Sequence, residues 1–244
     1  MTPGILGVDI GGTHLKAGVV DAGGKLLADK VRVATPYPNT PEVMLRALVA
    51  LVKKLPRYDL IAIGFPGVVR DGRVLTAPHF DQVAWADFPL AAELSRHLGG
   101  YPARLINDAE MQGLHVIKGR GLELVLTLGT GAGTALFRDG ELMPHMELAH
   151  HPIHKSKTYN DYIGEKALKK IGKKRWNHRV EKTIDILYAL LFYDHLFIGG
   201  GNSAHLEGKL PRNITLVSND AGIEGGAALW RDSASGVEAG RRLA

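Results

Sequence analysis

The 244-residue sequence contains no cysteine. Disulfide bonds and cysteine-ligated zinc or iron–sulfur centres are therefore excluded, and the fold depends on its apolar core. The sequence also lacks an apolar run long enough to span a membrane, and its N-terminus lacks the charged and then apolar segments of a secretion signal. We expect a cytoplasmic protein with one large or two medium-sized domains.

The two common glycine-rich phosphate loops are missing as well. No G-x-x-x-x-G-K-[ST] string occurs, which excludes a P-loop. The run LGTGAGTALF, residues 128–137, is rich in glycine but continues in the alternating pattern of a strand, whereas a dinucleotide fingerprint opens a helix. The run therefore predicts a strand, a glycine turn and a second strand.

The same pattern occurs near the N-terminus, in ILGVDIGGTHLKAGVVDAGG, residues 5–24. The two stretches align without a gap at an offset of about 118 residues, which indicates an internal duplication. Both glycine turns are suited to binding an anion. Glycine lets backbone N–H groups approach an anion, and threonine hydroxyls such as that of Thr134 add donors.

We predict two phosphate-binding turns, formed by Gly11, Gly12 and Thr13 and by Gly129, Thr130 and Gly131. Ordinary β-hairpins are the alternative.

Strand patterns alternate with helical patterns in both halves of the chain. After the first three strands come LIAIGF and ARLIN, and after the second copy come HLFIGG and ITLVS. Helical patterns separate them, beginning with one at 41–54 that Thr40 and Pro41 open. The alternation predicts an α/β fold with an N-terminal lobe, 1–109, and a C-terminal lobe, 110–244, with ligands at the strand ends.

Positive charge is concentrated in one segment. The net charge is +5, but residues 155–182 hold ten Lys or Arg and three acidic residues, so this segment is +7 and the remainder is slightly acidic. Apolar spacing predicts a helix over residues 160–192. Its basic residues form either a solvated face or a track for a polyanion such as nucleic acid, an acidic membrane or a phosphate chain. The candidate track residues are Lys169, Lys170, Lys173, Lys174 and Arg175.

Six motifs occur in the order and spacing found in the ROK family of sugar kinases: DIGGTHLKAGVVD, GFPGVV, LINDAE, LGTGAGTALF, ELAHHPI and FIGGG. The chain resembles this family over nearly its whole length, and its bacterial polyphosphate glucokinase branch most closely. The resemblance implies a two-lobed actin- and hexokinase-like (ribonuclease H-like) fold of duplicated β-β-β-α-β-α domains. It also implies transfer of a phosphoryl group from polyphosphate, and also from ATP, to the 6-hydroxyl of glucose.

The resemblance assigns roles to two aspartates. Asp108 is the expected general base beside the glucose 6-hydroxyl, and Asn107 is expected to hydrogen-bond a neighbouring hydroxyl. A helix cap before AEMQG is the alternative for this Asn-Asp pair. Asp9 lies in an apolar strand, where a carboxylate is costly unless it serves a metal or phosphate site, and it is expected to position Mg²⁺ through water.

The remaining site residues also follow from the resemblance. Glu147 and His150 match the family's E-x-G-H sugar-binding pair, with Ala149 in place of glycine. His79 is another expected sugar contact and stands where the family commonly has asparagine. Both departures leave the sugar less defined than the reaction. Further expected contacts are Gly67 to the sugar, Lys16 to phosphate, and Gly200 and Gly201 to the nucleotide or polyphosphate.

Histidines cluster around Glu147, at positions 145, 150, 151 and 154. Imidazole and carboxylate suit zinc, but no H-E-x-x-H string is present, and ATP-dependent relatives of this family usually carry a cysteine-rich zinc motif that a chain without cysteine cannot form. We expect no zinc.

Other functions stay open at this point. One is a strictly ATP-dependent hexokinase for another sugar, in which the lysines are only surface; another is a non-catalytic sugar- or polyanion-binding protein. The family also includes repressors with a helix-turn-helix, but Asp9 lies eight residues after Met1, so we expect no DNA-binding module. The resemblance suggests a homodimer.

Overall fold

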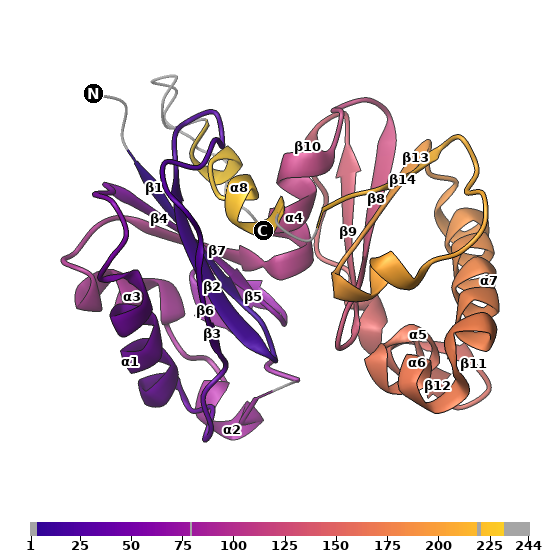
Figure 1. Ribbon diagram of the computed structural model, residues 1–244, viewed down its shortest axis with the longest axis horizontal. Coiled ribbons are helices and arrows are strands. Elements are labelled where there is room, and N and C mark those ends of the chain that lie inside the picture. Colours follow the sequence, from indigo (N-terminus) through magenta and orange to yellow (C-terminus); the bar gives the residue numbers. More distant parts are fainter. Residues whose placement is uncertain (1–3, 79, 219–220, 232–244) are drawn as a thin grey trace. The chain divides into compact units, whose positions relative to one another are not determined.

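The computed structural model describes residues 4–78, 80–218 and 221–231 (Figure 1). The chain divides into two compact units. Unit 1 comprises Met1–His115 and Asp220–Ala244, and unit 2 comprises Val116–Asn219.

Unit 1 is built on a five-stranded sheet in the order β3-β2-β1-β4-β7. The first three strands are antiparallel, and β1, β4 and β7 are parallel to one another. The strands are β1 (Ile5–Ile10), β2 (His14–Val20), β3 (Val31–Ala34), β4 (Leu60–Phe65) and β7 (Ala103–Asn107). A two-stranded hairpin, β5 (Val69–Arg70) and β6 (Arg73–Val74), and the short helix α2 (Gln82–Trp85) follow β4.

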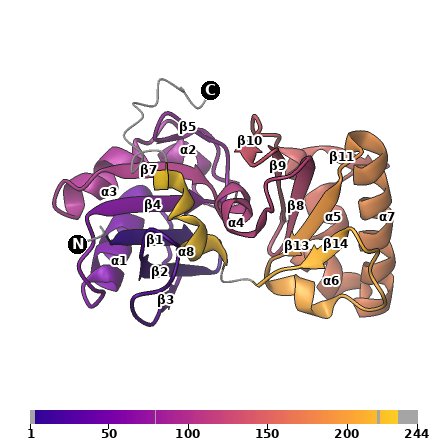
Figure 2. The same ribbon diagram turned by 90° about the horizontal axis from the view of Figure 1, so that it is seen from above.

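Helices cover both faces of this sheet (Figures 1 and 2). Helices α1 (Pro41–Val52) and α3 (Leu90–His97) pack on one face, where Leu6, Val8 and Ile10 of β1 are fully buried. Helices α4 (Asp108–Val116) and α8 (Ala221–Gly225) lie on the other face. Every second side chain of β1 therefore packs against α1 and α3.

Helix α8 lies close to β1 at Gly7. A Cβ on Gly7 of β1 would lie 2.6 Å from the carbonyl oxygen of Ile223, so only glycine lets the backbone of α8 approach the sheet this closely. This packing joins the last described segment to unit 1. The predicted lobes, 1–109 and 110–244, differ from the observed units mainly in this segment.

Unit 2 repeats the topology of unit 1. Its sheet has the order β10-β9-β8-β13-β14 with the same strand directions. The strands are β8 (Leu122–Leu128), β9 (Ala132–Arg138), β10 (Glu141–Leu142), β13 (His195–Gly199) and β14 (Ile214–Leu216). The repeated order confirms the predicted α/β fold class and its duplication.

The two copies of the duplicated unit differ in the length of the glycine turn. In unit 1 Ile10 pairs with Leu15, but in unit 2 Leu128 pairs with Ala132, so the second turn is one residue shorter. A shift of the strand register by one residue moves every side chain of that strand to the opposite face of the sheet. The shorter turn keeps Ala132 and Leu136 against the apolar cluster of unit 2.

The predicted helix over residues 160–192 is wrong in its continuity. Three helices occur instead: α5 (Tyr159–Ile163), α6 (Glu165–Ile171) and α7 (Lys173–Leu191), separated by Gly164 and Gly172. They follow a hairpin of β11 (Pro152–His154) and β12 (Lys157–Thr158). Glycine disfavours a helix because its backbone loses more conformational entropy on folding than that of other residues and because it has no side chain to pack. Within the described ranges, neither α7 nor any other helix is long and apolar enough to cross a membrane.

Carboxylates bind every backbone N–H group from residue 118 to residue 122, in the connector between α4 and β8. Glu123, which is 1% exposed, accepts from Lys118 (2.8 Å), Gly119 (2.7 Å) and Arg120 (3.2 Å). Asp139 accepts from Gly121 at 2.8 Å, and Asp194 accepts from Leu122 at 2.7 Å. The connector is thereby fixed to the sheet of unit 2.

We predict that Glu123→Ala lowers the free energy of unfolding by about 2–4 kcal/mol, because three N–H groups lose a charged acceptor. Glu123→Gln, which keeps one acceptor oxygen, should cost less. Urea unfolding followed by circular dichroism measures the change. Glu181→Ala, at an exposed position, is the control. Equal midpoints for Glu123→Ala and Glu181→Ala would contradict the prediction.

Candidate active site

The turn after β1 is held by His14 and by Thr35, the residue that follows β3 (Val31–Ala34). The backbone N–H of Gly11 donates to the His14 carbonyl at 3.0 Å, and the Thr35 hydroxyl donates to the Gly11 carbonyl at 2.7 Å. Gly12 and Thr13 are exposed, and within the described part of the chain their backbone N–H groups donate no hydrogen bond. The turn therefore leaves two N–H groups available as donors, and their binding of phosphate stays a prediction.

Asp9 and Lys16 face each other across β1 and β2. Their strand positions are paired, and the Lys16 Nζ lies 3.3 Å from the Asp9 Oδ2. The two side chains are only 20% and 24% exposed, with Asp9 the more buried. Burial raises the pKa of the Asp9 carboxyl above its ordinary value, and the Lys16 ammonium opposes this shift.

The surroundings of Asp9 suit an Mg²⁺ ion that is bound by one protein carboxylate together with phosphate and water. No group of three or more His, Asp or Glu side chains able to hold a metal occurs among the residues that the structure describes. Mg²⁺ is commonly held by one or two carboxylates together with substrate phosphates and water. Asp9, two residues before the first glycine turn, suits this mode, in which the phosphates of a bound substrate would complete the coordination.

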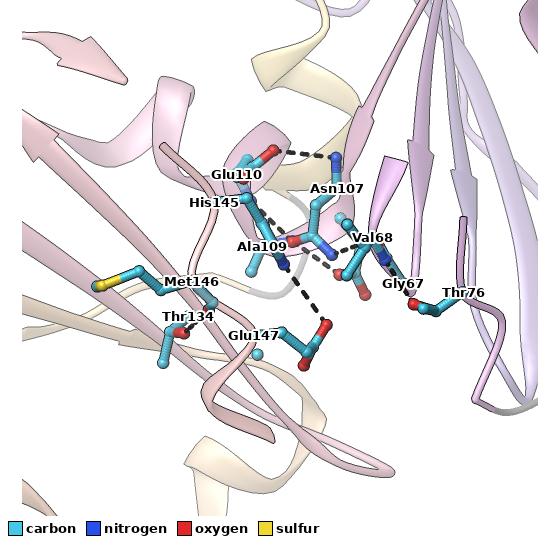
Figure 3. A network of polar contacts seen from close by, with 12 residues as sticks. Gly67, Val68, Thr76, Asn107, Ala109, Glu110, Thr134, His145, Met146 and Glu147 are labelled. Carbon is cyan, nitrogen blue, oxygen red and sulfur yellow. Dashed lines mark hydrogen bonds and ion pairs between the residues drawn. The ribbon is translucent and has the colours of Figure 1, made fainter. Parts of the chain in front are cut away.

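Asn107 and Asp108 lie where β7 passes into α4. The Asn107 Oδ1 accepts from the Ala109 N–H at 2.9 Å, and the Glu110 carboxylate accepts from the Asn107 N–H at 3.2 Å (Figure 3). The Asn107 Nδ2 donates to the carbonyls of Phe65 (3.3 Å) and Gly67 (3.1 Å). Asn107 is thus the helix cap and also ties the loop after β4 to β7.

Asp108 follows the cap directly. This residue is the first of α4, and its Oδ1 accepts from the Ala109 N–H at 2.8 Å. The side chain of Asn107 is engaged by the helix and by the β4 loop, so its observed role is to position its neighbours. Its contact with a sugar hydroxyl stays a prediction.

Gly67 shapes the loop after β4. A Cβ on Gly67 would overlap the carbonyl oxygen of Thr76, whose hydroxyl accepts from the Val68 N–H at 2.9 Å. His79, the other predicted sugar contact in this half, lies outside the described residues.

Three neighbouring parallel strands bring these residues to one edge of the sheet. Strands β1, β4 and β7 are adjacent and parallel, so their carboxyl ends meet at the same edge. Gly11 follows β1, Gly67 follows shortly after β4, and Asp108 follows β7. Within unit 1 the structure therefore brings the first glycine turn and the predicted base to one edge of the sheet.

The turn after β8 is tied to two other segments of unit 2. The Gly129 carbonyl accepts from the Glu165 N–H (3.0 Å) and from the Asn202 Nδ2 (2.9 Å). The Asn160 Oδ1 accepts from the Ala132 N–H at 2.8 Å. Sequence analysis did not identify Asn160 or Asn202, because they come from distant segments, α5 and the 3₁₀ turn Gly201–His205.

Thr134 does not serve the phosphate turn as expected. Its side chain is buried, and its hydroxyl donates to the Met146 carbonyl at 3.2 Å (Figure 3). Thr134 aligns with Lys16 in sequence, but the shorter turn shifts its strand register: Lys16 pairs with Asp9, whereas Thr134 pairs with Leu126. Thr130, at the turn itself, is exposed.

The predicted sugar pair of unit 2 follows Met146. The Glu147 carboxylate is 30% exposed and lies 3.4 Å from the His145 Nε2. His150, in the 3₁₀ turn Leu148–His150, is exposed. His151 and His154 lie beside the rings of Tyr159 and Tyr162, at 6.4 and 5.6 Å between ring centroids.

Gly200 and Gly201 line an open pocket of about 460 Å³. Small and apolar side chains form most of its wall, contributed by Ser203, Ala204, Leu216, Val217 and Ser218. Its size and composition are compatible with a small organic ligand.

The basic residues of α6 and α7 fall into two groups. Lys169 pairs with Glu165 at 2.6 Å, and Lys173 pairs with Glu207 at 2.9 Å. Lys170, Lys174 and Arg175 are exposed and form no ion pair within the ranges that the structure describes. Within those ranges, no acidic side chain neutralises the charges of this second group.

The predicted residues thus fall into two sets. Asp9, the first glycine turn, Lys16, Gly67, Asn107 and Asp108 belong to unit 1. The second glycine turn, Glu147, His150, the glycine pair at 200 and 201 and the basic residues belong to unit 2. That the two sets form one site stays a prediction.

Comparison with known proteins gives consistent results. The sequence model of the ROK family matches residues 5–155. Polyphosphate glucokinase of Mycobacterium tuberculosis is 29% identical over 241 residues, which cover 91% of this chain and 89% of the relative.

Solved structures with the same fold include two sugar kinases. The inorganic polyphosphate/ATP-glucomannokinase of Arthrobacter sp. strain KM is 31% identical, with a TM-score of 0.82 over 92% of this chain and 97% of that chain. A ROK family glucokinase from Streptomyces griseus, solved with glucose and AMPPNP, is 22% identical, with a TM-score of 0.78 over 93% and 98% of the chains. The first likeness extends to sequence, and the second concerns the fold alone.

Proposed function

The chain belongs to the ROK family and is a glucokinase-like sugar kinase, and we propose that it transfers the terminal phosphoryl group of inorganic polyphosphate to the 6-hydroxyl of glucose. The observation that carries the proposal is the single sheet edge of unit 1. At that edge a carboxylate, Asp108, and the first glycine turn, residues 11–13, follow parallel strands of one sheet.

The proposed reaction assigns one task to each group. Asp108 accepts the proton of the glucose 6-hydroxyl as its oxygen attacks the terminal phosphorus, and the shortened polyphosphate leaves. The turns at 11–13 and 129–131 donate N–H groups to the donor's phosphates, assisted by Lys16. Glu147 and His150 hold other sugar hydroxyls. Mg²⁺, held by Asp9 and the donor, would supply neutralisation of the phosphoryl charge.

Two observations support polyphosphate as the donor. Lys170, Lys174 and Arg175 are exposed cations without a local acidic partner among the described residues, as a flexible polyanion requires. Two of the three relatives reported above, those from Mycobacterium tuberculosis and Arthrobacter, are named for polyphosphate.

ATP is the second candidate donor, and mannose is a second candidate sugar. The pocket beside Gly200 and Gly201 has room for an adenosine group. The relative from Arthrobacter is named for both donors and for both glucose and mannose. An enzyme that accepts both donors would use the same glycine turns with each.

Removing the three unpaired cations tests the donor. The triple variant Lys170→Gln, Lys174→Gln, Arg175→Gln is expected to raise the KM for long-chain polyphosphate by about 10-fold or more and to weaken its salt dependence, because three phosphate contacts are lost. The kinetic constants with ATP should change less than about 2-fold, because rim charges matter little to a compact ligand.

A second triple variant provides the control. Lys25→Gln, Lys53→Gln and Lys54→Gln remove the same charge from exposed positions of unit 1. This variant should retain the wild-type KM for polyphosphate. An equal effect of both triple variants would show that only net charge matters, and no effect of either would refute the track.

A further inference from the structure

We propose that His145 is a positioning residue that fixes the Glu147 carboxylate for the sugar, an inference that rests on the proposed function. His145 is one of the extra histidines that the sequence left without a role. Its Nε2 lies 3.4 Å from the Glu147 Oε2, and Figure 3 shows the two side chains pointing toward each other. The other histidines nearby, at 151 and 154, lie beside tyrosine rings instead.

The backbone between the two side chains is anchored. Thr134 is buried in β9, and its hydroxyl donates to the carbonyl of Met146, the residue between His145 and Glu147. This hydrogen bond fixes the segment to a strand of the central sheet of unit 2. A rigid support of this kind lets a side-chain contact define a rotamer.

The exposures of the pair suit a supporting and a binding role. The His145 side chain is 19% exposed, whereas that of Glu147 is 30% exposed. The less exposed imidazole therefore holds one oxygen of a carboxylate that still reaches solvent. A carboxylate has acceptor capacity at both oxygens, so the second oxygen remains for sugar hydroxyls.

The chemistry of the contact defines what His145 does. An imidazole nitrogen that faces a carboxylate must carry its proton to donate, and the neutral or charged ring can do so. Without this donor the carboxylate rotates about its last torsion, whose energy profile is broad. Sugar binding then has to order the carboxylate as well, which weakens affinity without altering the reacting groups.

The expected kinetic signature is a split between KM and kcat. His145→Ala should raise the KM and the Kd for glucose by about 10-fold, the loss expected for one charge-assisted hydrogen bond, with kcat changed less than about 3-fold. The KM for polyphosphate should not change. His145→Gln, which keeps an N–H donor, should restore most of the affinity. His178→Ala, at a position 81% exposed on α7, is the control.

A double-mutant cycle tests whether His145 acts through Glu147. Glucose affinity is measured by calorimetry for wild type, His145→Ala, Glu147→Gln and the double variant. We expect the double variant to bind glucose as weakly as Glu147→Gln alone, because the partner of His145 is already altered. Additive losses, or a wild-type Kd for His145→Ala, would overturn the inference while leaving the proposed function intact. A wild-type protein that binds no sugar would overturn both.

Discussion

Asp108→Asn is expected to lower kcat for glucose phosphorylation by about 10³-fold, within the range of about 10² to 10⁴ that general-base catalysis contributes. The amide is nearly isosteric with the carboxylate and keeps an oxygen that accepts from the Ala109 N–H, as Asp108 does at 2.8 Å. The helix cap formed by Asn107 is unaffected. The change therefore removes the proton acceptor and little else.

Two measurements and a control variant separate this effect from misfolding. The variant should unfold at the wild-type urea midpoint and bind glucose within about 3-fold of the wild-type Kd, because the binding groups remain. Asp81→Asn is a matched control, since Asp81 also accepts backbone N–H groups at a helix start, at 3.1 Å from Val83 and Ala84. Asp108→Asn with a kcat within 10-fold of wild type would exclude Asp108 as the base.

Asp9→Asn is expected to lower kcat/KM by about 100-fold or more with either donor, because it removes the protein's carboxylate for the metal–phosphate complex. The same change should raise stability at neutral pH. Burial raises the pKa of Asp9, so the folded protein favours the uncharged form that asparagine imitates. Lys16 offsets only part of this cost.

The sign of the pH dependence follows from the raised pKa. In the unfolded chain Asp9 titrates near its ordinary value of 3.8, and in the folded chain it titrates higher. The folded state therefore binds the proton more tightly, and its stability falls as the pH rises from the unfolded pKa through the folded one. The free energy of unfolding of Asp9→Asn should lack this fall. A variant less stable than wild type at pH 7 would mean that the pair with Lys16 dominates.

Much of the fold was predictable because the duplication and the alternation of strands are local patterns. The sheet order of each unit follows from three hairpin-connected strands and two parallel ones. The one-residue difference between the turns was not predictable, since both copies align equally well in sequence. The breaks at Gly164 and Gly172 were visible as glycines, but the apolar spacing continued across them and favoured one helix.

The candidate site was predictable where it depends on strand ends. Gly11 and Asp108 follow parallel strands, so their common edge could be expected before the structure was known. Contacts between distant segments could not. Thr134 was expected to donate a hydrogen bond at the second glycine turn, but its hydroxyl donates to the Met146 carbonyl. The Asn107 amide donates to the Phe65 and Gly67 carbonyls, about forty residues earlier in the chain. Hydroxyl and amide groups bind whichever partner the packing brings near, and sequence spacing does not reveal that partner.

Formation of glucose 6-phosphate by the wild-type protein, with glucose, Mg²⁺ and inorganic polyphosphate as the sole donor, tests the account most directly. The account predicts turnover that is coupled to polyphosphate shortening in ³¹P NMR spectra and is lost in Asp108→Asn. Turnover with ATP but not with polyphosphate would contradict the proposed donor, and no turnover of glucose with either donor would contradict the proposed reaction.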